Sequence, residues 1–313
     1  MDIISRIEPG TRAVLDRLAR WDTTDVETLR ASYRAVRPAH VPPHPGVERR
    51  DGVVAGVRVR WYRPTDANGA LPGLVYFHGG AYVMGTLDEN DDRLDLMAAE
   101  LGCAIVSVDW RLAPEHPYPA GLDDAETVWR QVSGDPVAHG VDGERLVVGG
   151  ASAGAGLAAA LCLRINGRSV PQPALQLLIY AMLDDREVTA SIRALESGAG
   201  HWGLWPLRAQ RLTWQAYLSG LADVPSTAAP ARATADELRG LPPAFVGIGD
   251  VDAYLDENVA YATRLAGAGV PVELHVYPGV IHGGFVARPA TPRTRQFRDD
   301  VHAALRCVFG SLC

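Results

Sequence analysis

The chain has 313 residues and a mass of 33.6 kDa, with 47% hydrophobic and 21% charged residues and a mean hydropathy of −0.02. This balance is typical of a water-soluble globular protein and excludes disordered, collagen-like and polytopic membrane chains. All 30 basic residues are arginine, which excludes chemistry that needs a lysine amine, such as pyridoxal phosphate catalysis, Schiff-base aldol reactions and P-loop phosphoryl transfer. A net charge of −7 without an arginine-rich run argues against a nucleic-acid partner.

The first 45 residues predict two amphipathic helices that end in a proline-rich stretch, before any strand. From about residue 52, short apolar runs alternate with helical patterns, which is typical of an α/β fold with a mostly parallel sheet and helices on both faces. The expected strands cover residues 57–62, 74–77, 104–108, 146–148, 175–180, 244–248 and 272–277. The expected helices cover residues 91–101, 123–132, 153–165, 258–266 and 295–308.

Residues 185–222 interrupt this alternation with a helical stretch. It carries three of the seven tryptophans, Trp202, Trp205 and Trp214. Two interpretations are open: the aromatic side chains anchor the insertion to the core, or they form an apolar lid over a pocket.

The cysteines and the first residues of the chain indicate the cellular compartment in which we expect the protein. Cys103, Cys162, Cys307 and Cys313 lie far apart or in apolar surroundings, and they form neither a CxxC metal pair nor a dense disulfide framework. Charges within the first ten residues interrupt what would be the apolar region of a signal peptide. We therefore expect a cytoplasmic protein with reduced thiols.

The most apolar stretch, residues 146–163, contains a turn and is not expected to span a membrane. Within it, residues 150–154 read Gly-Ala-Ser-Ala-Gly and match the G-x-S-x-G pattern, in which small neighbours leave a serine hydroxyl exposed between a strand and a helix. Chance alone predicts about 0.1 such matches at this composition, so the motif by itself is weak evidence and its position in the predicted fold decides. Because an expected strand precedes the motif and an expected helix follows it, Ser152 is the candidate nucleophile.

A serine nucleophile needs a base to accept its proton and a third group to orient that base. His282 follows an expected strand in a loop with glycines on both sides. Asp250, Asp252 and Asp256 follow another expected strand, and spacing alone does not choose among them. Both loops lie past strand carboxyl ends, where α/β sheets place their sites.

Acyl transfer develops an oxyanion that backbone N–H groups stabilise, and loss of one such donor costs about 10²–10³ in rate. An expected strand runs into Gly79 and Gly80, which allow close approach of the backbone. We expect one donor from Ala153, directly after the nucleophile, and others from Gly79, Gly80 or Ala81. His78 is expected to brace this loop rather than to transfer protons.

Several motifs occur together in one order. Residues 78–81 read His-Gly-Gly-Ala, residues 109–120 read Asp-Trp-Arg-Leu-Ala-Pro-Glu-His-Pro-Tyr-Pro-Ala, and the G-x-S-x-G serine, the block at 252–257 and the Pro-Gly-Val-Ile-His of His282 follow. From about residue 50 to its carboxyl end, the chain thereby resembles the hormone-sensitive lipase family of bacterial carboxylesterases, also called α/β-hydrolase fold-3. In that family the block's first aspartate is the triad acid, so the resemblance favours Asp252.

The resemblance implies an α/β-hydrolase fold with a mostly parallel eight-stranded sheet, flanking helices and a helical cap. The chain then divides into two cap segments and two parts of a core: 1–45 as amino-terminal cap helices, 46–184 as core, 185–222 as cap insertion and 223–313 as core. The resemblance also makes Asp109, Arg111 and Glu115 a structural network, which we expect to be built from ion pairs.

Four positions depart from the family's motifs. Ala81 replaces the third glycine of an HGGG motif, and Ala151 stands where Asp or Thr is usual. Ala253 and Tyr254 replace the usual Pro-Leu after the acid. No catalytic group is lost, but these changes bear on the rate and on the shape of the pocket.

The implied function is that of a cofactor-free serine carboxylesterase that hydrolyses small, short-chain esters through an acyl-enzyme. Its pocket would include Tyr82, Trp202, Trp205 and Trp214. No metal, nucleic-acid or membrane partner is expected, and a homo-oligomer is left open. The alternatives are an amidase or deacetylase or a longer-chain lipase with the same triad. A non-catalytic ligand receptor on this fold is disfavoured because His282 is present.

Overall fold

The computed structural model describes residues 3–15, 21–35, 41–194, 205–286 and 290–310. Within them the chain forms one eight-stranded sheet. Its strands are β1 (Val47–Val54), β2 (Val57–Pro64), β3 (Leu71–Phe77), β4 (Ala104–Val108), β5 (Val141–Ala151), β6 (Gln176–Ile179), β7 (Ala244–Val251) and β8 (Val272–Ile281), in the order β1-β2-β4-β3-β5-β6-β7-β8. Strands β3 to β8 are parallel, and β2 pairs antiparallel with β1 and β4. The predicted eight-stranded, mostly parallel sheet is confirmed.

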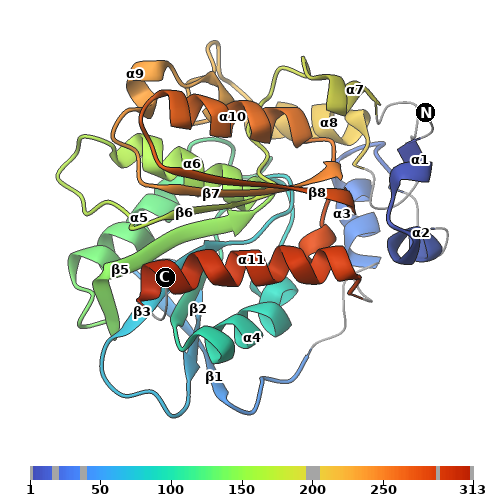
Figure 1. Ribbon diagram of the computed structural model, residues 1–313. Coiled ribbons are helices and arrows are strands. Elements are labelled where there is room, and N and C mark those ends of the chain that lie inside the picture. Colours follow the sequence, from blue (N-terminus) through green and yellow to red (C-terminus); the bar gives the residue numbers. More distant parts are fainter. Residues whose placement is uncertain (1–2, 16–20, 36–40, 195–204, 287–289, 311–313) are drawn as a thin grey trace.

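Helices cover both faces of this sheet (Figure 1). They are α1 (Ile3–Arg6), α2 (Pro9–Leu15), α3 (Val26–Ala35), α4 (Asp91–Leu101), α5 (Ala120–Gly134), α6 (Ala153–Ile165), α7 (Ala190–Ala194), α8 (Leu207–Tyr217), α9 (Ala235–Leu238), α10 (Leu255–Gly267) and α11 (Pro292–Phe309). Helices α4 and α11 lie on one face, and α5, α6 and α10 lie on the other (Figure 1). Helix α3 contacts α8 beside the carboxyl ends of the strands. None of the helices in these ranges combines the length and the apolar character needed to cross a bilayer.

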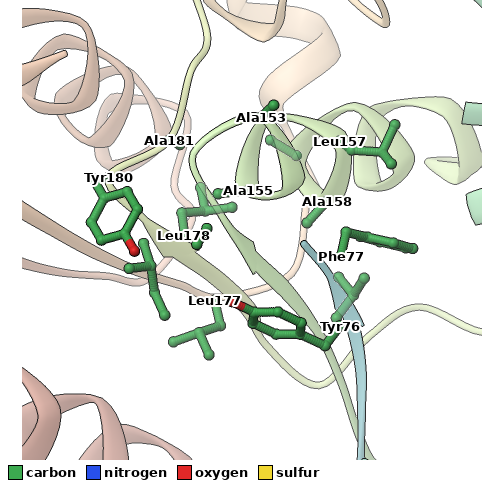
Figure 2. Packing of buried hydrophobic residues seen from close by; sticks show 14 of the residues in the cluster. Tyr76, Phe77, Ala153, Ala155, Leu157, Ala158, Leu177, Leu178, Tyr180 and Ala181 are labelled. Carbon is green, nitrogen blue, oxygen red and sulfur yellow. The ribbon is translucent and has the colours of Figure 1, made fainter. Parts of the chain in front are cut away.

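The core forms because successive residues of the central strands point to opposite faces, and both faces are covered. Figure 2 shows Phe77 beside Ala158 of α6, whereas Tyr76 lies with Leu177 on the other side of the sheet. All four side chains are at most 1% exposed. The small side chains of α6 let this helix pack closely against the sheet, which positions its first turn at the strand carboxyl edge.

The apolar stretch at 146–163 divides as the sequence indicates. Its first part belongs to β5 and its last part to α6, with Ser152 in the turn between them. This is the arrangement that we expect of a nucleophile elbow, and it is incompatible with a continuous transmembrane helix.

Strand β1 is absent from the strands predicted from apolar runs, because four of its first five residues are charged. One of them holds the strand in place. The Arg49 guanidinium bonds Asp91 at 2.9 Å and Asp95 at 3.0 Å, and all three side chains are at most 7% exposed. Asp91 also accepts from the Tyr62 hydroxyl at 2.6 Å. Buried charges of opposite sign thus join β1 and β2 to α4. Because these contacts are charged, the sequence of β1 lacks the apolar pattern by which a strand is recognised.

A second buried charge joins α10 to the segment after β6. Glu257 is 3% exposed, and its Oε1 accepts from the backbone N–H of Leu183 at 2.7 Å. Burial raises the pKa of Glu257 well above its usual value, and the bond from Leu183 opposes this only in part. The folded protein therefore holds this proton at a pH where the unfolded chain releases it.

This proton predicts how the Glu257→Gln variant behaves. The glutamine keeps an oxygen acceptor for Leu183 but cannot ionise. Because the pKa of Glu257 is raised in the folded state, this group's contribution to the wild-type free energy of unfolding is lost as the pH rises from about 4.5 toward the folded pKa. The variant has no such group, so its free energy of unfolding does not show this loss. We expect the stability of the variant relative to wild type to increase between about pH 5 and pH 8, measured by urea denaturation. A difference that is constant over this range contradicts the prediction.

Candidate active site

Ser152 lies in the turn from β5 to α6, at the carboxyl edge of the sheet. Its backbone has φ 55° and ψ −122°, a sparsely populated conformation that turns the strand directly into the helix. Gly150 and Gly154 make this possible, because a Cβ on Gly154 would lie 2.0 Å from the Phe77 carbonyl oxygen and one on Gly150 would lie 2.5 Å from it. The small residues of the motif therefore let this turn approach the end of β3.

Ser152, His282 and Asp252 lie in one hydrogen-bonded line. His282 Nε2 is 3.0 Å from Ser152 Oγ, and His282 Nδ1 is 2.9 Å from Asp252 Oδ2. An ionised carboxylate only accepts, so Nδ1 carries the proton and donates to Asp252, while Nε2 accepts from the serine hydroxyl. The imidazole is thus oriented as a general base toward Ser152. The side chain of Asp252 is fully buried.

The three aspartates that the spacing left open have different partners. Asp252 bonds His282 and, through Oδ1, accepts from the backbone N–H of Tyr254 at 2.9 Å. Asp250 bonds Arg6 at 2.9 Å and accepts from the backbone N–H of Gly279. Asp256 accepts from the backbone N–H of Ser191 at 2.8 Å. Among them, Asp252 is the one that the structure places against the imidazole.

Two of the candidate oxyanion donors, Gly79 and Ala153, lie beside the serine. A Cβ on Gly79 would lie 3.4 Å from the Ser152 Cβ, so the glycine backbone borders the nucleophile. Ala81 takes φ 51°, a left-handed conformation that is costly for alanine, and so keeps the turn that the usual third glycine would make. Within the described ranges, the amides of Gly80, Ala81 and Ala153 have no hydrogen-bond acceptor. Ala81 and Ala153 are at most 3% exposed, and amides without acceptors are rare in buried residues, which favours a role in binding.

The loop that carries these donors is held from two sides. His78 Nδ1 donates to the Gly79 carbonyl at 2.7 Å, and its ring stacks on Trp110 at 5.1 Å, in agreement with the expected bracing role. From α3, Arg30 donates to the Val83 carbonyl at 2.7 Å and to Ala113 O at 2.9 Å. Arg30 was not among the predicted residues, because no motif surrounds it.

The expected ion-pair network at 109–120 is instead a set of separate pairs. Arg111 bonds Asp124 of α5 at 2.8 Å, and Glu115 bonds Arg30 at 2.7 Å. The third residue, Asp109, pairs with Arg58 of β2 at 3.2 Å. The three side chains therefore point toward different elements, because turns at 113–115 and 118–119 change the direction of the segment.

Three of the four predicted pocket residues lie among buried rings. Tyr82 stacks on Tyr217 at 4.0 Å and contacts Trp214 at 5.2 Å, and we call these three residues the aromatic cluster. Trp205 contacts Trp21 of the amino-terminal segment at 5.2 Å. Trp202 lies outside the described residues. Tyr82 adjoins the nucleophile's surroundings, since its hydroxyl donates to the Met182 carbonyl at 3.1 Å and the Met182 amide donates to the Ser152 carbonyl.

Known proteins are similar to this chain in sequence and in fold. A family model described as "alpha/beta hydrolase fold" matches residues 74–286. Carboxylesterase NlhH of Mycobacterium tuberculosis is 34% identical over 306 residues, with 88% of each chain covered. Ethyl acetate hydrolase of Pseudomonas putida is 36% identical over 239 residues, with 74% of this chain and 72% of that protein covered.

Solved structures of esterases have a similar fold. Esterase LipW from Mycobacterium marinum is 36% identical with a TM-score of 0.85, and 98% of this chain and 97% of that chain are covered. A bacterial heroin esterase is 32% identical with a TM-score of 0.87, with 98% of this chain and 99% of that chain covered. These findings confirm the predicted family and support the predicted enzyme class, a carboxylic ester hydrolase. The chain belongs to the α/β-hydrolase fold family that its motifs resemble, the hormone-sensitive lipase type.

Proposed function

We propose that the chain is a serine carboxylesterase that hydrolyses short-chain esters through Ser152, His282 and Asp252. The observation that carries this proposal is the continuous line from the Asp252 carboxylate through the imidazole to the serine hydroxyl, at 2.9 Å and 3.0 Å. In the two segments next to Ser152, the amides of Gly80, Ala81 and Ala153 have no acceptor within the described ranges. A nucleophile, its base, an orienting acid and oxyanion donors are the parts that acyl transfer needs.

The mechanism follows from this arrangement. His282 Nε2 takes the proton of Ser152 as Oγ attacks the ester carbonyl carbon, and Asp252 stabilises the imidazolium that forms. The amides of Gly80 and Ala153 donate to the tetrahedral oxyanion. As the C–O bond breaks, the imidazolium gives its proton to the leaving alcohol and an acyl-enzyme remains. Water, deprotonated by the same imidazole, then attacks the acyl carbon. The bond from that carbon to Ser152 Oγ breaks as the imidazolium returns the proton to Oγ, which releases the acid and restores the serine.

A preference for short acyl chains is supported by the rings near the serine. The side chains of the aromatic cluster, Tyr82, Trp214 and Tyr217, are at most 3% exposed, and we propose that these rings limit the length of the acyl chain. The related ethyl acetate hydrolase is named for an ester with a two-carbon acyl group. We further propose that the amino-terminal segment and the 185–222 insertion cover the acyl pocket, as their contact through Trp21 and Trp205 suggests.

The Ser152→Ala variant tests the chemistry. We expect kcat for p-nitrophenyl acetate to fall by about 10⁴-fold or more, because the attacking oxygen is gone, with unchanged thermal unfolding. A fluorophosphonate should label the wild type at Ser152, located by peptide mass spectrometry, and should not label the variant. Ser107→Ala, which also removes a buried hydroxyl, is the matched control and should keep wild-type rates. Wild-type ester hydrolysis by Ser152→Ala would disprove the mechanism, and faster cleavage of aryl amides than of esters would favour an amidase.

Acyl-chain preference is tested with a p-nitrophenyl ester series. We expect kcat/KM to be highest for acyl chains of about two to eight carbons and to fall for longer ones. Trp214→Ala should shift the optimum toward longer chains, because it removes a ring from the aromatic cluster. Trp61→Ala, which changes a ring stacked on His139 outside that cluster, should leave the optimum in place. Rates that rise beyond about twelve carbons in the wild type would instead indicate a lipase.

A further inference from the structure

The imidazole of His282 lies against two buried tyrosine rings. Tyr180, after β6, meets it at a ring distance of 4.9 Å and an angle of 69°, and Tyr254, before α10, meets it at 5.0 Å and 89°. Both rings are at most 4% exposed. The orientation of the base therefore depends on how firmly these two rings are held.

Tyr254 makes two contacts with the catalytic residues and one with the insertion. Its ring contacts His282, and its backbone N–H donates to Asp252 Oδ1 at 2.9 Å. Its hydroxyl donates to Gln210 Oε1 at 2.8 Å. Burial raises the pKa of the Tyr254 phenol well above its usual value, so it remains a donor throughout the range in which esterases are assayed.

Gln210 belongs to α8 of the insertion and is completely buried. Its Oε1 also accepts from the indole N–H of Trp205 at 3.3 Å, and its Nε2 donates to the Asp184 carbonyl at 3.4 Å. An indole N–H can only donate, so the amide must turn its oxygen toward Trp205, and the same oxygen then accepts from Tyr254. The chemistry of the partners thus determines the direction of every bond at Gln210.

We propose that Tyr254 is a positioning residue through which α8 of the insertion holds the His282–Asp252 pair in its catalytic orientation, by way of the hydrogen bond to Gln210. The inference rests on the proposed esterase function, because it concerns how that function's base is held. It goes beyond the family resemblance, since the family usually has leucine where this chain has Tyr254. A leucine has no group that could reach Gln210.

A positioning residue and a structural anchor affect different measured quantities. If the bond only fastened α8 to the core, its loss would lower stability or weaken substrate binding, and turnover of bound substrate would stay the same. If the bond positions the base, its loss allows the ring and the imidazole to shift. Proton transfer then becomes less efficient in the bound complex, so kcat falls while KM changes little.

The test compares four variants over a range of p-nitrophenyl acetate concentrations that reaches saturation, so that kcat and KM are both measured. Tyr254→Phe keeps the ring on His282 and removes the hydroxyl. Gln210→Leu removes the acceptor, and the double variant removes both. Tyr261→Phe is the matched control, because it removes a hydroxyl from a buried tyrosine of α10 that has no hydrogen bond in the described part of the chain. The rate of fluorophosphonate labelling is measured in parallel, since it requires the nucleophile and its base but no particular ester.

For Tyr254→Phe we expect kcat and the labelling rate to fall by about five- to twenty-fold, with KM within about twofold of wild type. The double variant should be no slower than Gln210→Leu, because both changes break one bond. Tyr261→Phe should keep wild-type rates. Unchanged kcat and labelling in Tyr254→Phe, or fully additive losses in the double variant, would overturn the proposal. A wild type that cleaves no ester but is labelled at Ser152 would count against the proposed substrate class alone, and the labelling rates would still test Tyr254.

Discussion

The buried carboxylate of Asp252 is the constraint on which the site depends. A fully buried charge is tolerated only where hydrogen bonds replace the water that it has lost. Here one oxygen accepts from His282 Nδ1 and the other from the backbone N–H of Tyr254. The first bond assigns the imidazole tautomer and turns Nε2 toward Ser152, and the second holds the carboxylate itself. Neither bond could be lost without leaving a buried charge short of a partner.

The parallel sheet brings these groups together and makes them predictable. Ser152, Asp252 and His282 each lie within one residue of the carboxyl end of β5, β7 or β8, and parallel strands place those ends along one edge. Strands buried on both faces have continuous apolar runs, so they are recognised from the sequence. The loops that follow these strands are short, so they offer few candidate site residues, and their glycines and titratable residues are easily identified.

Features without a local pattern could not be predicted. Strand β1 is an edge strand with many charged residues. Arg49 of β1 is held by Asp91 of α4, which lies more than 40 residues away along the chain. The charges at 109–120 were expected to form one network, but the direction of each side chain depends on the tertiary fold. Tyr254 appeared only as a departure from a motif. Its partner, Gln210, is 44 residues away in the helical insertion, where no motif marks it.

The two halves of the site are therefore held by elements outside the sheet. Arg30 of α3 binds the Val83 carbonyl, in the turn that follows the candidate oxyanion donors. Gln210 of α8 binds Tyr254, which lies against the base. Because α3 and α8 also contact each other, a displacement of one would change the contacts of the other and disturb donors and base together. Such an arrangement keeps both halves preorganised while these segments are docked, and preorganised donors are what electrostatic catalysis requires.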